Sequence, residues 1–104
     1  MAPYDVLIIG AGPAGLTAGL YCGRARLRTV IVEQGIPGGE LINTARIEDY
    51  PGFEAIGGAD LAERLERQAR TFGVEITTDE VVEVASAGAW KRVVAGEGSD
   101  TVFS

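Results

Sequence analysis

Residues 4–15 read Tyr4-Asp5-Val6-Leu7-Ile8-Ile9-Gly10-Ala11-Gly12-Pro13-Ala14-Gly15, and in them a short apolar run leads directly into a glycine-spaced turn. Four consecutive large apolar residues, Val6 to Ile9, predict a buried strand. We expect it to be the central strand of a parallel sheet that is covered on both faces. The turn that follows has G-x-G-x-x-G spacing and opens a predicted helix, an order typical of a dinucleotide site.

Each glycine of this turn has its own role. Gly10 allows the tight turn, Gly12 lets the backbone approach a pyrophosphate, and Gly15 lets the helix pack closely on the strand. Pro13 fits the first helical turn, because its missing N–H would have no intrahelical partner there. The free N–H groups and the positive end of the helix dipole then face the phosphates.

A second strand and an acidic residue complete the βαβ pattern. The helix is predicted from Pro13 to Arg26, and the apolar run Thr29 to Val32 follows it and ends at Glu33. Glu33 lies 23 positions after Gly10, where a carboxylate would accept hydrogen bonds from an adenosine ribose. The simpler alternative is an ordinary βαβ unit with a solvated acid at the strand end. The order of strand, turn, helix, strand and acid favours nucleotide binding.

Composition limits the classes of function. The 104 residues include 9 Lys and Arg and 15 Asp and Glu, so the formal charge is -6 and no basic stripe is present for nucleic acid. The chain has no histidine and one cysteine, which argues against a hydrolytic triad, a metal site or an intrachain disulfide. Cys22 is predicted to be a buried thiol on the first helix. No apolar run is long enough for a membrane span or a signal peptide, so we expect a cytoplasmic protein.

The rest of the chain predicts a long loop, a second helix and further strands. The stretch from Gln34 to Gly58 is rich in glycine and proline but has an apolar interior, which predicts a packed loop with one short helical turn that wraps a ligand. A helix is predicted from Ala59 to Phe72 and a third parallel strand from Val74 to Thr77. Residues 81–85, 90–95 and 101–103 predict an antiparallel meander. The expected fold class is α/β, with a Rossmann-like parallel sheet and a small antiparallel meander.

Three blocks of the sequence resemble the N-terminal FAD-binding segment of the low-molecular-weight thioredoxin reductases, over essentially the whole chain. The blocks are residues 10–15, then Glu33 followed by Pro37-Gly38-Gly39-Glu40-Leu41, and then Ile47-Glu48-Asp49-Tyr50-Pro51-Gly52-Phe53. The NAD-binding domain of an ordinary dehydrogenase would not explain the second and third blocks, so they favour FAD over NAD. The resemblance implies an oxidoreductase in which NADPH reduces FAD and the flavin reduces a dithiol. Its partner would be thioredoxin or a similar disulfide protein, and the full-length protein would be a homodimer.

The resemblance also implies which residues contact the cofactor. The glycine turn and Glu33 would hold the ADP half of FAD, and the Gly-Gly loop would run beside the pyrophosphate, the ribityl chain and the flavin. The backbone of Val81 would contact adenine. The implied cofactor-binding residues are Gly10, Gly12, Pro13, Ala14, Gly15, Glu33, Gln34, Gly38, Gly39, Glu40, Leu41, Thr44, Asp49 and Val81. No catalytic residue is assigned in this chain.

Two positions depart from the usual pattern of that family. Gln is common where this chain has Glu40, and Asn is common where it has Asp49. A carboxylate beside the flavin should disfavour the reduced, more electron-rich ring. Alternatively, both carboxylates point to solvent or are paired, for example with Arg46, and have no effect on the flavin.

The resemblance further implies that the chain is incomplete. In the family, an NADPH domain with a C-x-x-C dithiol is inserted after this segment, and a C-terminal part completes the flavin site. We therefore expect residues 1–104 to be the N-terminal part of an FAD-binding domain, and the isolated chain to be inactive. Two alternatives are a ferredoxin-NADP reductase-type flavoprotein without a dithiol and a free-standing nucleotide-binding module without catalysis.

Overall fold

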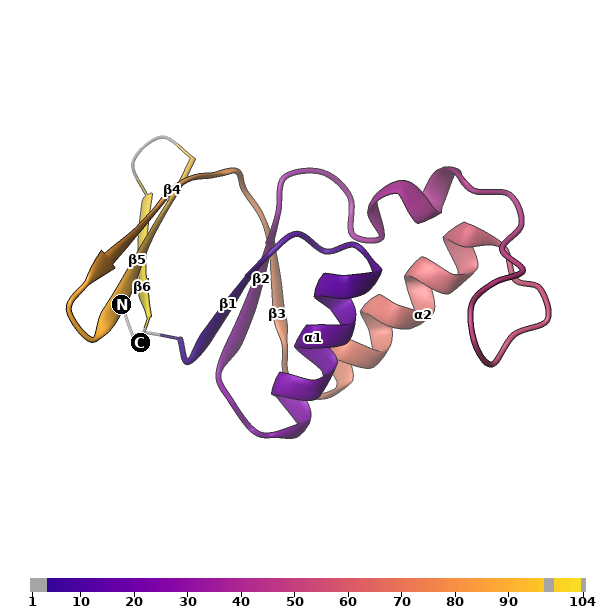
Figure 1. The fold of residues 1–104 in the computed structure, drawn as a ribbon, viewed down its shortest axis with the longest axis horizontal. Coiled ribbons are helices and arrows are strands. Elements are labelled where there is room, and N and C mark those ends of the chain that lie inside the picture. The colour runs from indigo at the N-terminus through magenta and orange to yellow at the C-terminus, as the bar shows by residue number, and fades with distance from the viewer. Residues whose placement is uncertain (1–3, 97–98, 104) are drawn as a thin grey trace.

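The computed structural model describes residues 4–96 and 99–103 and consists of two helices, one short 3-10 helix and two three-stranded sheets (Figure 1). The elements in chain order are β1 (Val6–Ile9), α1 (Pro13–Arg24), β2 (Thr29–Glu33), η1 (Gly39–Asn43), α2 (Gly58–Thr71), β3 (Glu75–Thr78), β4 (Val81–Ala87), β5 (Trp90–Ala95) and β6 (Ser99–Phe103). The first sheet is parallel, in the order β1-β2-β3, and the second is antiparallel, in the order β4-β5-β6.

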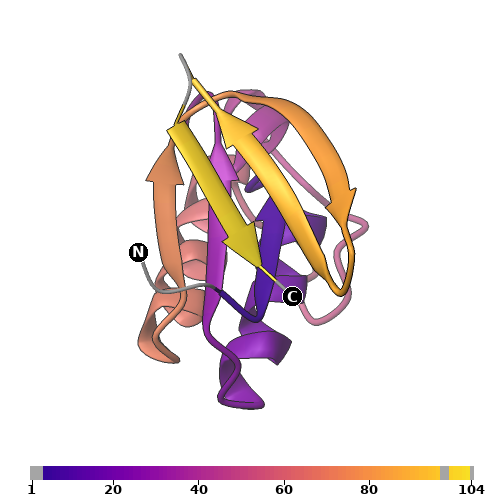
Figure 2. The ribbon, with the colours of Figure 1, turned by 90° about the vertical axis from the view of Figure 1, so that its left-hand side faces the viewer.

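The parallel sheet lies between the helices and the antiparallel meander. Figure 1 shows α1 and α2 on one side of the sheet and the meander on the other. Figure 2, in which the left-hand side of Figure 1 faces the viewer, shows the meander in front of the sheet. The predicted α/β class, the parallel sheet and the meander are therefore confirmed. The two crossovers, β1-α1-β2 and β2-α2-β3, bring the carboxyl ends of the three parallel strands to one edge.

The central strand of the parallel sheet is β2. All four residues from Thr29 to Val32 are buried, and Ile31 pairs with Ile8 of β1 on one side and with Ile76 of β3 on the other. β1 lies at the edge of the sheet, and its last residue, Ile9, is 58% exposed. Within the described residues, β1 is therefore an edge strand and not the central strand that the sequence predicts. Among the described residues no strand pairs with the outer edge of β1, so its apolar run is covered less completely than that of β2.

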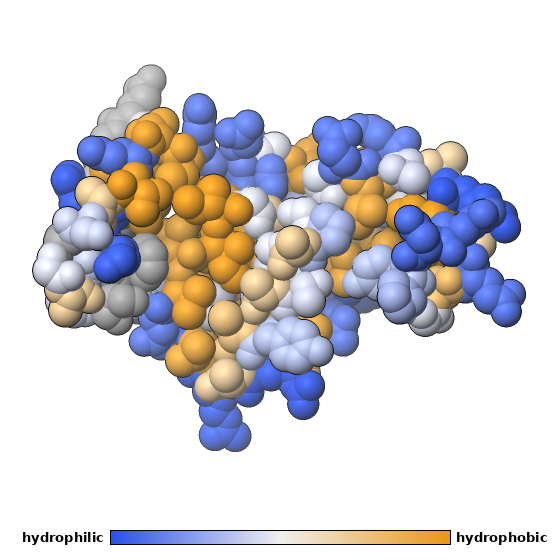
Figure 3. Space-filling model, in the orientation of Figure 1, coloured by the Kyte–Doolittle hydropathy of each residue, from blue (hydrophilic) through white to orange (hydrophobic). Residues whose placement is uncertain are grey.

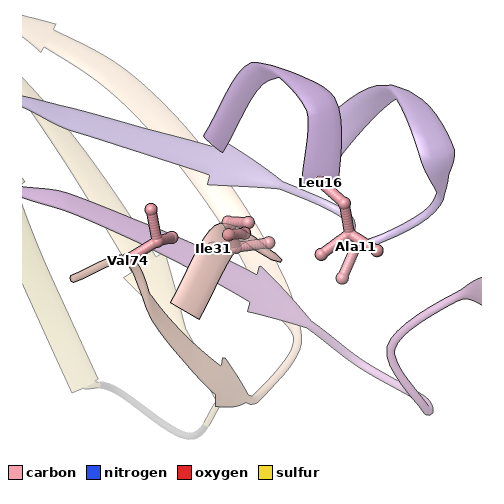
Figure 4. Close-up of a cluster of buried hydrophobic side chains, with 5 residues drawn as sticks. Ala11, Leu16, Ile31 and Val74 are labelled. Atoms are coloured by element: carbon pink, nitrogen blue, oxygen red, sulfur yellow. The ribbon is translucent and has the colours of Figure 1, made fainter. Parts of the chain in front are cut away.

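The main hydrophobic core lies between the helices and the parallel sheet. Figure 4 shows Ala11, Leu16, Ile31 and Val74, which are buried together with Ala69 of α2. Small residues let α1 approach the sheet closely, because a Cβ on Gly19 would lie 2.8 Å from Cδ1 of Ile31. The apolar strand pattern and the small residues of α1 together produce this packing.

α1 is shorter than predicted. It ends at Arg24 instead of Arg26, because Ala25 is the C-cap and Arg26 has a left-handed φ of 62° that no helix can continue. Cys22 lies on this helix as predicted, but its side chain is only partly buried.

The long loop after β2 is ordered as predicted. It contains η1, and backbone hydrogen bonds between Ile47 and Ile56 close residues 48–55 into a smaller loop. Ile47, Ile56 and Leu61 of α2 form a second buried cluster that fixes this region on α2.

The second helix and the third strand lie within one residue of their predicted bounds. α2 begins and ends one residue earlier, and β3 begins and ends one residue later. Gly73, with a φ of 84°, follows the end of α2. In the ranges that the structure describes, no helix is long and apolar enough to span a membrane.

Candidate functional site

The glycine-rich turn connects the carboxyl end of β1 to the N-terminus of α1. Gly10 has a left-handed φ of 101°, and its N–H donates to the carbonyl of Val32 at 2.8 Å, which ties the turn to β2. Gly12 is the N-cap of α1. A Cβ built on Gly10 or Gly12 would meet no heavy atom within 4 Å. The backbone is therefore open at the helix N-terminus, where N–H groups and the dipole favour an anion.

Gly15 serves close packing instead. A Cβ on Gly15 would lie 1.9 Å from the carbonyl oxygen of Gly10, so α1 can leave the turn at this angle only because Gly15 has no side chain. Pro13 and Ala14 are the first two residues of α1, and Pro13 occupies the predicted first helical position.

Gly38 and Gly39 bring a second backbone segment to the same turn. The N–H of Gly38 donates to the carbonyl of Ala11 at 2.7 Å. A Cβ on Gly39 would have Cα of Gly12 as its nearest atom, at 3.8 Å. The backbone of Gly39 thus approaches that of Gly12, and neither residue has a side chain. We call this pair of glycines the glycine cradle.

Glu33 ends β2 and lies against the turn. Its Oε1 accepts the N–H of Ala11 at 2.7 Å, and its Oε2 accepts the N–H of Gly35 at 2.8 Å. The side chain of Glu33 is partly buried. Both oxygens of the carboxylate are therefore engaged with backbone groups on either side of the strand end.

A depression of about 140 Å³ adjoins Glu33. It is lined by the predicted site residues Gly10, Glu33, Gln34 and Val81, and by Ile9, Val32 and Asp79. The last three were missed by the sequence analysis. Asp79 could have been found, because it directly follows β3, and the carboxyl ends of parallel strands meet at the edge where ligands bind. Apolar walls beside carboxylate acceptors suit an adenosine, which combines a flat ring with hydroxyl donors.

Four predicted site residues lie further along the loop. Glu40 and Leu41 belong to η1, and Thr44 is its C-cap, with a hydroxyl that donates to the carbonyl of Glu40 at 3.3 Å. The side chain of Leu41 is partly buried and packs against the second cluster. Asp49 lies in residues 48–55, which Figure 1 shows beyond η1, at the far end of the molecule from the meander.

The carboxylates of Glu40 and Asp49 are both exposed. Arg46 does not pair with either of them, because its Nε lies 2.5 Å from Oε1 of Glu48. The suggested pairing of Glu40 and Asp49 with Arg46 is therefore wrong, since a nearer carboxylate, two positions along the chain, holds the guanidinium.

A groove larger than this depression lies elsewhere. A groove of about 430 Å³ separates the small loop from α2, and its lining includes Tyr50, Phe53 and Arg64. The guanidinium of Arg64 lies 5.7 Å from the centroid of the Phe53 ring. This groove is lined by neither a glycine nor a carboxylate. It therefore lacks the glycine turn and the carboxylate that the sequence predicts for the nucleotide site, and size alone does not identify that site.

A tyrosine and a glutamate interact at the amino ends of the parallel strands, at the opposite end of the sheet from the candidate site. The hydroxyl of Tyr4, just before β1, donates a hydrogen bond to Glu75 at the start of β3, and this bond raises the pKa of the Tyr4 phenol. Because both residues lie at the amino ends of parallel strands, they take no part in the site at the carboxyl ends.

Comparisons with known proteins agree on one family. The sequence matches the pyridine nucleotide-disulphide oxidoreductases over residues 4–103. It is 50% identical over 93 residues to a thioredoxin reductase of Listeria monocytogenes, a match that covers 89% of this chain and 29% of the relative.

Solved structures give the same result. A thioredoxin reductase from Streptococcus pyogenes superposes with a TM-score of 0.93 at 41% identity, over 98% of this chain and 33% of that one. A ferredoxin-flavin thioredoxin reductase from Clostridium acetobutylicum superposes with a TM-score of 0.83 at 26% identity. This match covers 97% of this chain and 35% of that one. The chain thus spans about a third of the length of these proteins and matches the N-terminal region of thioredoxin reductases. It belongs to the pyridine nucleotide-disulphide oxidoreductase family.

Proposed function

We propose that residues 1–104 form the N-terminal part of an FAD-binding domain in a thioredoxin-reductase-like flavoprotein. The glycine cradle at the N-terminus of α1 carries this proposal, because a pyrophosphate needs backbone N–H donors that no Cβ shields. Glu33 and the adjoining depression lie beside the cradle, in the place that an adenosine needs. The ADP half of FAD would be held by Gly10, Gly12, Pro13, Ala14, Gly15, Glu33, Gln34 and Val81.

The remaining contacts would follow the loop away from the cradle. Gly38 and Gly39 would lie beside the pyrophosphate and the ribityl chain, and η1 would lead toward the flavin. Glu40, Leu41, Thr44 and Asp49 would contact this half of the cofactor. When bound, FAD supplies the electron transfer, and these residues bind and orient it.

For the whole protein we propose NADPH as electron donor, thioredoxin or a similar disulfide protein as acceptor, and a homodimeric state. An NADPH domain and a C-terminal FAD-binding part would lie outside residues 1–104. Two observations support the part of this proposal that concerns further segments. The relatives are about three times as long as this chain, and the outer edge of β1 has no partner strand among the described residues.

Exposed apolar side chains on the strands also support a larger domain. Figure 3 shows such side chains gathered over the part of the molecule where Figure 1 places β1 and β4. Ile9, Val82 and Val84 are 58%, 57% and 54% exposed. Further strands or a further segment packed there would bury this surface.

A competition experiment tests FAD binding. We expect ADP to displace FAD from the chain and FMN not to displace it, because the described contacts favour the ADP half of the cofactor. Fluorescence anisotropy of FAD, measured during titration with ADP or with FMN, gives the answer. Displacement by FMN alone, or no binding of FAD at all, would contradict the proposal.

We also predict that the isolated chain does not reduce thioredoxin with NADPH, even with excess FAD. Such a cycle needs a nicotinamide site and a dithiol, and Cys22 alone cannot form an intramolecular disulfide. NADPH oxidation, followed by absorbance, should stay at the background rate. Turnover that survives Cys22→Ser would show that a catalytic group in these residues has been missed.

A further inference from the structure

We infer that Glu33 is a positioning residue, whose carboxylate holds the glycine turn in its binding conformation before a nucleotide arrives. The ligand-binding part of this inference rests on the proposed function. A residue that only accepts hydrogen bonds from a ribose would leave the free turn unchanged when it is replaced. A positioning residue would not.

The backbone of Ala11 is fixed from two sides. Ala11 is completely buried, its N–H donates to Oε1 of Glu33 at 2.7 Å, and its carbonyl accepts the N–H of Gly38 at 2.7 Å. A buried N–H without an acceptor is strongly disfavoured. The bond to Glu33 therefore stabilises the turn at the residue between Gly10 and Gly12.

The second carboxylate oxygen holds another segment. Oε2 of Glu33 accepts the N–H of Gly35 at 2.8 Å, in the loop that leads from β2 to Gly38. One side chain thus connects the turn after β1, the end of β2 and the start of the loop. These segments carry the two sides of the glycine cradle, so the position of Glu33 sets their spacing.

The Glu33 carboxylate can accept further hydrogen bonds from a ligand. An ionised carboxylate has about four acceptor positions, and the two backbone bonds leave about two of them, which suits the two hydroxyls of a ribose. A glutamine cannot do the same, because its NH₂ group would face one of the two backbone N–H donors. Glu33→Gln therefore removes a backbone bond while it keeps the size of the side chain.

Amide hydrogen exchange of the nucleotide-free chain tests the positioning role. We expect the amides of Ala11 and Gly35 to be protected in the wild type, and at least one of them to exchange about tenfold faster or more in Glu33→Gln. Glu33→Asp keeps the charge on a shorter side chain and should also accelerate exchange. Asp79→Asn is the matched control, because Asp79 lines the same depression but bonds neither amide.

The binding of two ligands tests whether this positioning of the turn contributes to nucleotide affinity. ADP offers ribose hydroxyls to Glu33, whereas 2′,3′-dideoxy-ADP offers none. A residue that binds only ribose would leave affinity for the dideoxy compound unchanged in Glu33→Gln. We expect that affinity to fall about fivefold, and affinity for ADP to fall further, because the turn itself is less well positioned.

The possible outcomes are distinct. Unchanged exchange at both amides in Glu33→Gln and Glu33→Asp, or equal affinity of wild type and Glu33→Gln for dideoxy-ADP, would overturn the positioning role. If the wild-type chain binds neither ligand, the proposed function is wrong, and the exchange rates in the free chain still decide whether Glu33 holds the turn.

Discussion

Replacing Gly12 with Val should lower the affinity of the chain for ADP at least about tenfold, while the free energy of unfolding falls by no more than about 1 kcal/mol. Gly12 has a φ of -76°, which every L-residue adopts, and a Cβ there meets no protein atom within 4 Å. The folded chain therefore has room for a Cβ at this position. The methyl groups of the valine would occupy the space over the helix N-terminus that a pyrophosphate needs. Titration calorimetry with ADP and thermal unfolding measure the two quantities.

Gly57→Val is the matched control. Gly57 is the N-cap of α2, has a φ of -68°, and a Cβ there would lie 3.7 Å from the carbonyl oxygen of Ala45. The variant replaces the same kind of capping glycine but lies outside the cradle, so it should bind ADP like the wild type. If Gly12→Val also binds ADP like the wild type, the pyrophosphate does not lie over this turn.

Replacing Gly15 with Ala should strongly lower the stability of the chain. The new Cβ would lie 1.9 Å from the carbonyl oxygen of Gly10, and backbone has to move to relieve that contact. We expect a loss of about 3 kcal/mol or more, which for a chain of this size lowers Tm by about 12 °C or more. Differential scanning calorimetry of the variant measures this shift.

Gly12→Ala, in the same motif, provides the comparison for stability. Its Cβ has open space around it, so Tm should change by only a few degrees. Equal values of Tm for Gly15→Ala and Gly12→Ala would show that α1 does not depend on the close approach at Gly15.

The sequence predicts the elements of this fold well where a pattern depends on neighbouring residues. Such patterns are formed by residues that lie close together in the sequence. Examples are the apolar runs of β1 and β2, the glycine spacing before α1 and the amphipathic pattern of α2. Within the described residues β1 lies at the edge of the sheet instead of its centre, because an apolar run indicates a buried strand but does not state how many strands pair with it.

In the candidate site, too, some features follow from local sequence and others depend on the tertiary structure. The glycine spacing and the distance from Gly10 to Glu33 follow from local sequence, and the structure brings these residues to one edge of the sheet. The two backbone bonds of Glu33 and the place of Asp79 could not be read from spacing, because they depend on how the ends of β2 and β3 meet the turn. The partner of Arg46 likewise depends on side-chain conformation within an irregular loop.

We propose that the glycine turn, Glu33 and the Gly38–Gly39 pair together bind the ADP half of FAD. Titration of ADP into the isotope-labelled chain, with amide chemical shifts recorded by NMR, tests it most directly. We predict that the largest changes occur at Gly10 to Gly15, Gly35, Gly38–Gly39 and Val81. Changes concentrated at the groove lined by Tyr50, Phe53 and α2, or no changes at saturating ADP, would contradict the claim.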